Sequence, residues 1–564
     1  MLRCRNLTVR PEGNPLAAPI LDRASATFVP HAMNAIIGPS GCGKTMLVKS
    51  MLGLVPVDAE GEVWLDQKRI TQPEDLLGMV AFAPQFSIAQ PKLTVAECLR
   101  YGLELTVADS SIQVERLEHV LGVIGLAEHR HKRVESLSGG QLRRLGLGLE
   151  LLVDPPTLIC DEVTSGLDPR SENTILDLLS GLARDRGKTL LCIIHNLAKL
   201  NYFDWITVLN AGEVVFQGTL PELYAHFEIP DALGLYDALN ARPQAFWRER
   251  WEQTRGKKLL PHLASESKSG NTQAAHADTP RPGLISQFAT LMRRRLRLLL
   301  RDHGYLAMVM AITFGFPVMV VIFALDGLPQ LSSPPLEPQG FASIQATINY
   351  TRETAQTASL VTSLVMFQVI LLTLMGANNG SREIAGERLL YEKERLTGLR
   401  PGAYAGSKLI FTGLLAAFQG VWMTTFVKII CVFPGPWETQ MAMLALVCVA
   451  MTWVCLAFSA WMNSADKAST LSIYLVGFQL PLSGVVLALP SYLVWVFRPF
   501  INAYWGWAGY FSTMKEERLY DAYTYTYSHT YISNPVISSG VLLAHAAVGS
   551  GLVWYGCRRR RWNA

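Results

Sequence analysis

Apolar and polar positions are distributed so unevenly that the chain of 564 residues divides into two parts. The second part holds a series of apolar stretches, each close to the ~20 residues that cross about 30 Å of hydrocarbon as a helix. Buried core helices of a soluble protein could explain one or two such stretches, but not six. The pattern therefore predicts membrane spans at residues 305–325, 358–375, 409–433, 441–462, 471–489 and 536–555.

Basic residues flank these stretches unequally. One side carries the runs at residues 293–301, 382–408 and 558–561 together with Lys467, and the other side carries only Arg352, Arg498, Lys515 and Arg518. The positive-inside rule then predicts that both termini are cytoplasmic, and no signal peptide is expected before the first strand. The net charge of +4 is small, and the basic residues of the chain lie beside apolar stretches. Contact with a membrane surface explains this distribution of basic residues better than binding of nucleic acid does, so we do not expect nucleic acid as a partner.

The first part contains a glycine-rich segment between a short apolar run and a helix-like run. It reads Gly38, Pro39, Ser40, Gly41, Cys42, Gly43, Lys44 and Thr45. This spacing is typical of a phosphate-binding loop, in which backbone N–H groups surround an anion, the lysine reaches the β- and γ-phosphates and the threonine hydroxyl can bind Mg²⁺. A chance glycine-rich turn is the alternative. The pattern favours a nucleoside triphosphate as ligand.

Two further motifs follow in a fixed order. Ser138, Gly139, Gly140 and Gln141 precede a helix-like apolar run, although this segment alone could be a glycine turn at the start of a helix. A buried strand then ends in Asp161 and Glu162. Such paired carboxylates suit phosphoryl transfer to water, because Asp161 can hold Mg²⁺ while Glu162 polarises the attacking water.

Together these motifs resemble the ATP-binding cassette of ABC transporters, and Asp168 and His195 follow where that family has functional residues. The resemblance implies that two cassettes close head to tail around two ATP molecules, with the residues 138–141 of one facing the γ-phosphate held by Lys44 of the other. It also implies that Gln85 senses Mg²⁺, which Thr45 and Asp161 bind, and that His195 steadies the γ-phosphate. Taken singly, Gln85 would more often be a surface amide and His195 a histidine satisfied at a strand end.

A cassette followed by six spans is the order found in ABCG-type half-transporters, which the charged segment at residues 381–398 also resembles. The likeness implies an α/β P-loop NTPase cassette with a RecA-like core and a helical subdomain, followed by an all-α domain of six spans. We expect the cassette at residues 1–245, a linker at 246–284 and the membrane domain at 285–564, with a cytoplasmic coupling helix near 381–398. No aromatic residue stands near Val9 to stack on adenine, which departs from the family pattern.

The implied function is ATP-driven export by a homodimer, or by a dimer with a related half-transporter, in a bacterial plasma membrane. The spans contain few polar residues, Gln368, Gln419, Lys428 and Gln479, which favours an amphipathic or lipid-like substrate. Of these we expect Lys428 to snorkel, and Gln368 and Gln479 to line a cavity. A mechanochemical ATPase acting on a partner protein or on lipid remains the alternative, and the fusion argues against an importer. The nine cysteines are expected to be buried small hydrophobes, and alkylation of Cys42 should obstruct the phosphate-binding loop.

Overall fold

The computed structural model describes residues 1–11, 17–54, 59–254, 280–324, 341–485, 490–515, 520–521, 523–524 and 531–559. Contacts divide the chain into two compact units. Among the described residues, the cassette unit comprises those within Met1–Thr290 and Leu389–Arg400, and the membrane unit comprises those within Leu291–Arg388 and Pro401–Arg559. The segment Leu389–Arg400 thus lies between two membrane helices in sequence but folds with the cassette.

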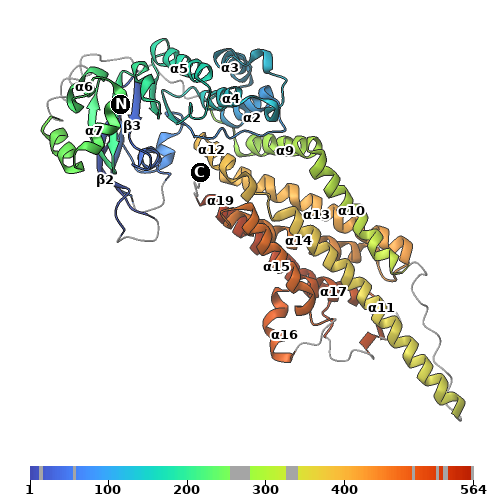
Figure 1. The fold of residues 1–564 in the computed structure, drawn as a ribbon. Helices are drawn as coiled ribbons and strands as arrows, with labels where there is room; N and C mark the ends of the chain where they lie inside the picture. The colour runs from blue at the N-terminus through green and yellow to red at the C-terminus, as the bar shows by residue number, and fades with distance from the viewer. Residues whose placement is uncertain are drawn as a thin grey trace. The chain divides into compact units, whose positions relative to one another are not determined.

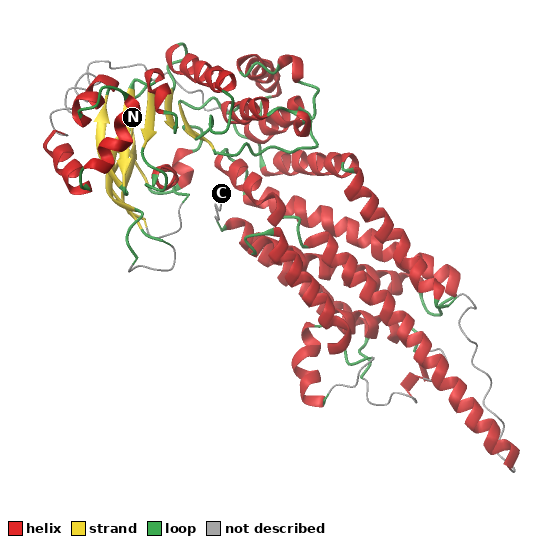
Figure 2. Ribbon diagram, in the orientation of Figure 1, coloured by secondary structure: helices red, strands yellow, loops and turns green. Residues whose placement is uncertain are grey.

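The cassette unit is built on two sheets (Figures 1 and 2). The larger has the order β10-β9-β3-β8-β7-β6, in which only the β10–β9 pair is antiparallel. Its central strands are buried along their whole length, as expected for a parallel sheet covered on both faces. Its strands are β3 (Met33–Ile37), β6 (Val80–Ala83), β7 (Thr157–Asp161), β8 (Thr189–Ile193), β9 (Trp205–Asn210) and β10 (Glu213–Gly218).

A smaller antiparallel sheet has the order β2-β1-β4-β5 and covers one side of the core. It comprises β1 (Leu2–Val9), β2 (Leu21–Thr27), β4 (Ala59–Leu65) and β5 (Lys68–Ile70). The helices of the cassette unit are α1 (Lys44–Met51), α2 (Val95–Thr106), α3 (Ser110–Val123), α4 (Gly139–Leu151), α5 (Pro169–Arg184), α6 (Leu220–Phe227) and α7 (Leu235–Ala241). Two further helices belong to it in part: the first turns of α9 (Leu284–Arg301), and α12 (Arg388–Leu396) from Leu389 onward. Helices α2, α3 and α4 contact one another and form a helical subdomain (Figure 1).

The packed part of the cassette extends past residue 245. Residues 244–254 are helical, and Trp247 and Trp251 are buried against Phe216, His226 and Phe227. The first residues of the expected linker are therefore part of the cassette core, because their two tryptophans supply apolar surface that a flexible segment lacks. Most of the remaining expected linker lies outside the described residues.

The membrane unit is all helical (Figure 2). Its helices are α10 (His303–Ile322), α11 (Phe341–Gly380), α13 (Pro401–Cys431), α14 (Trp437–Trp461), α15 (Ala465–Leu482), α16 (Ser491–Phe497), α17 (Asn502–Ser512) and α19 (Pro535–Arg558). Helix α14 is central, since it contacts α11, α13, α17 and α19. Gly376 and Gly380 permit this packing: a Cβ on Gly380 would lie 2.3 Å from the Thr452 carbonyl oxygen of α14. Small residues one turn apart are a common contact between membrane helices.

Among the described residues, five helices are long and apolar enough to cross a membrane. Four of them are α10, α13, α14 and α19, and the fifth is the run Ile344–Leu396, which includes most of α11. The expected span at residues 471–489 is not confirmed. Its helix α15 begins earlier, at Ala465, and so includes Asp466 and Lys467, while residues 486–489 lie outside the described part of the chain.

Candidate functional site

The glycine-rich segment forms a tight loop between β3 and α1. Gly43 caps α1 with a φ of 101°, and Gly38 approaches β9 so closely that a Cβ would lie 2.0 Å from the Leu209 carbonyl oxygen. Only glycine fits at Gly38, whereas a Cβ on Gly41 would meet no atom within 4 Å. Lys44 is buried and its Nζ donates to the Gly38 and Pro39 carbonyl oxygens at 2.9 and 3.0 Å. The loop thus wraps around the Lys44 ammonium at the start of α1, and a cation beside a helix N-terminus suits a phosphate chain.

Glu162 is held by two side chains at the carboxyl end of β7. Gln85 Nε2 donates to Glu162 Oε2 at 3.0 Å, and His195 Nε2 lies 2.5 Å from Glu162 Oε1. The Glu162 backbone has a φ of 49°, a left-handed conformation that is uncommon for a residue with a side chain and often marks a functional site. The parallel sheet explains why these three side chains lie close together. Strands β6, β7 and β8 are neighbours, and Gln85, Glu162 and His195 each follow the carboxyl end of one of them.

Thr45 and Asp161 supply a pair of oxygen atoms next to this group. Thr45 Oγ1 donates to Asp161 Oδ1 at 3.1 Å, and Asp161 is buried. Burial raises the pKa of the Asp161 carboxyl above its usual value, although the Thr45 hydroxyl opposes that rise. Burial likewise lowers the pKa of Lys49, whose ammonium is attracted by Asp161. A hydroxyl and a partly desolvated carboxylate are suitable ligands for Mg²⁺, which prefers oxygen.

The residues 138–141 lie apart from this group within the same chain. Ser138 caps α4 by accepting from the Gln141 backbone N–H, and Gln141 Oε1 accepts in return from the Ser138 backbone N–H at 3.0 Å. A Cβ on Gly140 would lie 3.0 Å from Ser171 Oγ in α5, and Asp168 caps that helix by accepting from the Arg170 and Ser171 N–H groups. Within the described residues no hydrogen bond or ion pair joins these residues to the glycine-rich loop or to Glu162.

Sequence reasoning missed one residue of the loop. Tyr236, in α7, donates its hydroxyl to the Gly38 carbonyl oxygen at 3.3 Å. Burial raises the pKa of this tyrosine, so the hydroxyl stays a donor. The two residues are far apart in sequence, and no local pattern signals that they meet.

The segment Leu389–Arg400 is anchored in the cassette unit by buried polar contacts. Lys393 Nζ lies 2.7 Å from Glu150 Oε1 in α4. Gln287 donates to the carbonyl oxygens of Leu105 and Gly398 at 2.9 and 3.1 Å and accepts from the Arg400 N–H at 3.1 Å. Leu396 packs against the cassette core. The start of α9, the end of α2 and the segment Leu389–Arg400 therefore form one joint.

The polar side chains expected to reach water or to line a cavity are instead buried in the membrane unit. Lys428 does not snorkel: it is 4% exposed and donates to the Gly435 carbonyl oxygen and to Gln440 Oε1, both at 2.6 Å. Gln479 accepts from the Ala503 N–H at 3.0 Å and is buried, as is Gln368, so neither faces an open cavity within one chain. Gln419 bridges Asn379 and Thr313. Helix ends and polar side chains inside the bundle bind Lys428, Gln419 and Gln479, because hydrocarbon offers them no partner. Gln368 differs, since its side-chain nitrogen and oxygen are buried and have no hydrogen-bond partner among the described residues.

Comparison with known proteins identifies both halves of the chain. Residues 21–165 match the ABC transporter family model and residues 286–514 match the ABC-2 type transporter model. The chain is 28% identical over 481 residues to the ABC transporter ATP-binding/permease protein Rv1747 of Mycobacterium tuberculosis, covering 82% of this chain and 52% of that protein. It is 32% identical over 234 residues to ABC transporter G family member 23 of Arabidopsis thaliana, covering 38% of each chain. The chain thus spans about half of the first of these relatives and less of the second.

The cassette alone also matches shorter proteins over most of their length. It is 30% identical over 231 residues to the energy-coupling factor transporter ATP-binding protein EcfA1 of Leuconostoc mesenteroides. The aligned residues make up 38% of this chain and 84% of that protein. A solved structure, the ATP-binding cassette MJ0796 as a post-hydrolysis dimer with ADP and Pi, is 24% identical, with 39% of this chain and 98% of that chain covered and a TM-score of 0.36. The chain therefore belongs to the ABC transporters, as an ATP-binding cassette joined in one polypeptide to an ABC-2 type membrane domain.

Proposed function

We propose that this protein exports an amphipathic or lipid-like substrate across a membrane, driven by ATP hydrolysis. The observation that carries the proposal is the position of Glu162, which Gln85 and His195 hold beside Thr45 and Asp161. These groups match the needs of ATP hydrolysis, and the same chain supplies helices long enough to cross a membrane.

The proposed chemistry divides the tasks among the chain's own residues. Lys44 and the N–H groups of the residues 38–45 bind the phosphates, and Glu162 accepts a proton from the attacking water. His195 and Gln85 orient the Glu162 carboxylate through the hydrogen bonds already described. Thr45, Asp161 and Gln85 would hold Mg²⁺, which supplies positive charge to the phosphate oxygens.

A second chain completes the site in this proposal. Among the described residues, no hydrogen bond or ion pair joins residues 138–141 to the glycine-rich loop of their own chain, which supports their role at a nucleotide bound by another copy or by a related half-transporter. Ser138, Gly139 and Gly140 stand at the N-terminus of α4, where backbone N–H groups attract a phosphate. Asp168 lies beside this helix start and would shape the same interface.

Two features support a direction and a location. The basic runs flanking the apolar helices favour cytoplasmic termini in a plasma membrane, which would place the cassette in the compartment that contains ATP. The interior of the membrane unit is mainly apolar, and Gln419, Lys428 and Gln479 are hydrogen-bonded within it, which favours an amphipathic substrate over a strongly charged one.

Vesicle transport separates export from the alternative, a mechanochemical ATPase that moves no solute. The full chain is reconstituted with its cassette outward, and ATP-dependent accumulation of fluorescent amphiphiles is measured beside a Glu162→Gln control. Export predicts accumulation by the wild-type protein and none by the variant. ATP hydrolysis that a partner protein stimulates, with no amphiphile moved, would contradict export and favour the alternative.

A further inference from the structure

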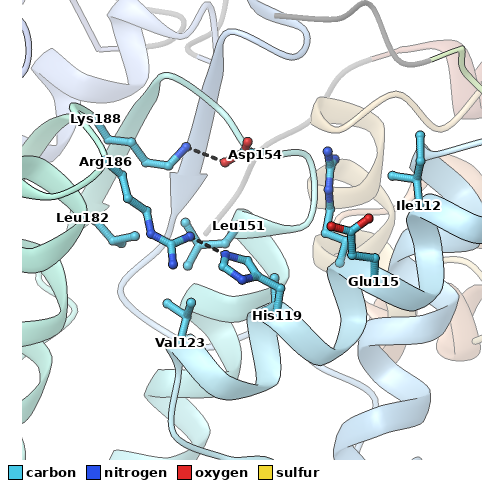
Figure 3. Close-up of a pocket in the computed structure, with 11 residues that line it drawn as sticks. Ile112, Glu115, His119, Val123, Leu151, Asp154, Leu182, Arg186 and Lys188 are labelled. Atoms are coloured by element: carbon cyan, nitrogen blue, oxygen red, sulfur yellow. Dashed lines mark hydrogen bonds and ion pairs between the residues drawn. The ribbon is translucent and has the colours of Figure 1, made fainter.

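A cavity lies in the cassette unit away from the residues proposed for ATP hydrolysis, where α3 meets the segments that follow α4 and α5 (Figure 3). It encloses about 240 Å³, which is below the range usual for drug-sized ligands and suits a smaller one. Its lining includes the charged or polar residues Glu115, Arg116, His119, Asp154, Arg186 and Lys188, together with apolar side chains from α3, α4 and α5.

The charges around the cavity are not balanced. Lys188 is buried and its Nζ pairs with Asp154 Oδ1 at 2.7 Å, so this cation is neutralised. Arg116 donates instead to the Leu152 carbonyl oxygen at 3.0 Å, and Arg186 donates to His119 Nε2. In the part of the chain that the structure describes, neither arginine lies within ion-pair distance of a carboxylate, including that of Glu115.

The Arg186 guanidinium is held by His119. A guanidinium can only donate, so His119 Nε2 is the acceptor in this contact. Figure 3 shows the Arg186 guanidinium directed at His119, with Leu182, Leu151 and Val123 around them. The site therefore combines two uncompensated guanidinium groups with an apolar wall, which is the complement of an anion attached to hydrocarbon.

We propose that this cavity binds a small molecule with a phosphate or carboxylate group on a short hydrocarbon chain, and that its binding changes the rate of ATP hydrolysis. Arg116 links the cavity to the nucleotide site, because Leu152 is the C-terminal cap of α4, the helix that begins at Gly139. An anion that attracts Arg116 competes with the Leu152 carbonyl oxygen for this guanidinium. Such a ligand acts on the end of the helix whose other end carries Ser138.

The regulatory part rests on the proposed function, since its readout is ATP hydrolysis, whereas ligand binding is measured separately. The probe is octyl phosphate, added to the full chain in lipid nanodiscs. Inorganic phosphate, which has the anion without the hydrocarbon chain, and octanol, which has the chain without the anion, are tested beside it. Arg116→Gln and Arg186→Gln remove the two cations, and Val123→Phe fills the cavity without changing charge. Arg184→Gln is the matched control, because Arg184 is exposed in the last turn of α5 and does not line the cavity.

We expect saturable octyl phosphate binding to the wild type and to Arg184→Gln, weakened roughly ten-fold or more by each of the other variants. Octanoate should bind the same site if a carboxylate suffices. Equal binding by all variants would show partition into lipid and overturn the proposal. Inorganic phosphate binding as tightly as octyl phosphate would overturn the hydrocarbon part. Binding without any change in ATP hydrolysis, in protein that hydrolyses ATP, would overturn the regulatory part, and absence of hydrolysis would instead contradict the proposed function.

Discussion

Lys393 and Glu150 form an ion pair of 2.7 Å in which the two side chains are only 7% and 2% exposed. Glu150 lies near the end of α4, and Lys393 belongs to the segment Leu389–Arg400 that the sequence inserts between two membrane helices. Burial raises the pKa of the Glu150 carboxyl, and Lys393 opposes this shift. A charge buried in this way needs its partner, so the pair ties the segment Leu389–Arg400 to the helix that begins at Gly139.

Replacing Lys393 with methionine should uncouple the proposed transporter. Glu150 would lose its cation and take up a proton or water, at a cost of about 3–5 kcal/mol. Stimulation of ATP hydrolysis by a transported amphiphile should fall about 5- to 150-fold in the variant, while unstimulated hydrolysis persists. The measurement is the ratio of the two rates in nanodiscs.

Two variants control this experiment. Lys92→Met breaks an ion pair with Glu135 that is about one-third exposed, and should change the ratio little. The exchanged pair Lys393→Glu with Glu150→Lys should recover part of the coupling. A single variant that folds and is stimulated like the wild type would contradict the coupling role.

The position of this ion pair could not be predicted, although a charged helical segment within residues 381–398 could. The charge pattern of residues 381–398 indicates a helix outside lipid, but it does not say which charges face which unit. The structure places Glu387 against Lys408 at 2.6 Å and Arg388 against the Ala460 carbonyl oxygen, both inside the membrane unit. Only the residues from Leu389 to Arg400 fold with the cassette. Tertiary packing brings Lys393 to Glu150, and no local sequence pattern indicates this contact.

Glu162→Gln should abolish ATP turnover and leave ATP binding intact. The substitution removes the proton acceptor but keeps the Thr45–Asp161 pair and Lys44, and losing general-base catalysis typically costs ~10²- to 10⁴-fold. Phosphate release and binding of a fluorescent ATP analogue are measured side by side. Phosphate release close to the wild-type rate would show that another group accepts the proton.

Motifs with fixed spacing made the residues that we propose as catalytic predictable, whereas contacts between residues far apart in sequence were not predictable. The order of Lys44, Glu162 and His195 along the chain places them at one edge of a parallel sheet, and the structure brings Glu162 and His195 within hydrogen-bond distance. Tyr236 reaches the same loop from α7 without any motif. Lys428 was misjudged because a lysine near the end of an apolar stretch usually reaches water, whereas here the Gly435 turn and Gln440 bind it inside.

Alkylation of Cys42 should be slow at neutral pH and should accelerate as pH rises. Burial raises the pKa of this thiol above its usual value, with Lys44 opposing, so the reactive thiolate is scarcer at pH 7 than in a free cysteine. The rate of inactivation by N-ethylmaleimide is followed between pH 7 and pH 9 with and without ATP. ATP should protect, and Cys42→Ala should resist the reagent. Rapid inactivation at pH 7, or inactivation of Cys42→Ala at the wild-type rate, would contradict the assignment of Cys42.

A mixture of two inactive variants tests whether a second chain completes the site. Lys44→Ala removes the cation under the phosphates, and Ser138→Arg places a bulky cation where the proposed partner nucleotide binds. In a head-to-tail heterodimer both lesions fall in one site, and the other site keeps Lys44 from one chain and Ser138 from the other. Differently tagged chains are purified in tandem, and their ATP hydrolysis is compared with each variant alone. Recovery of up to about half of the wild-type rate is expected if the two sites act independently.

No recovery in proven heterodimers would have one of two meanings: either both sites must work together, or Ser138 does not act across the interface. A Ser138→Arg chain paired with a wild-type chain separates these outcomes. That pair has one intact site, so its activity would show that one site suffices and would leave the missing recovery as evidence against the head-to-tail arrangement.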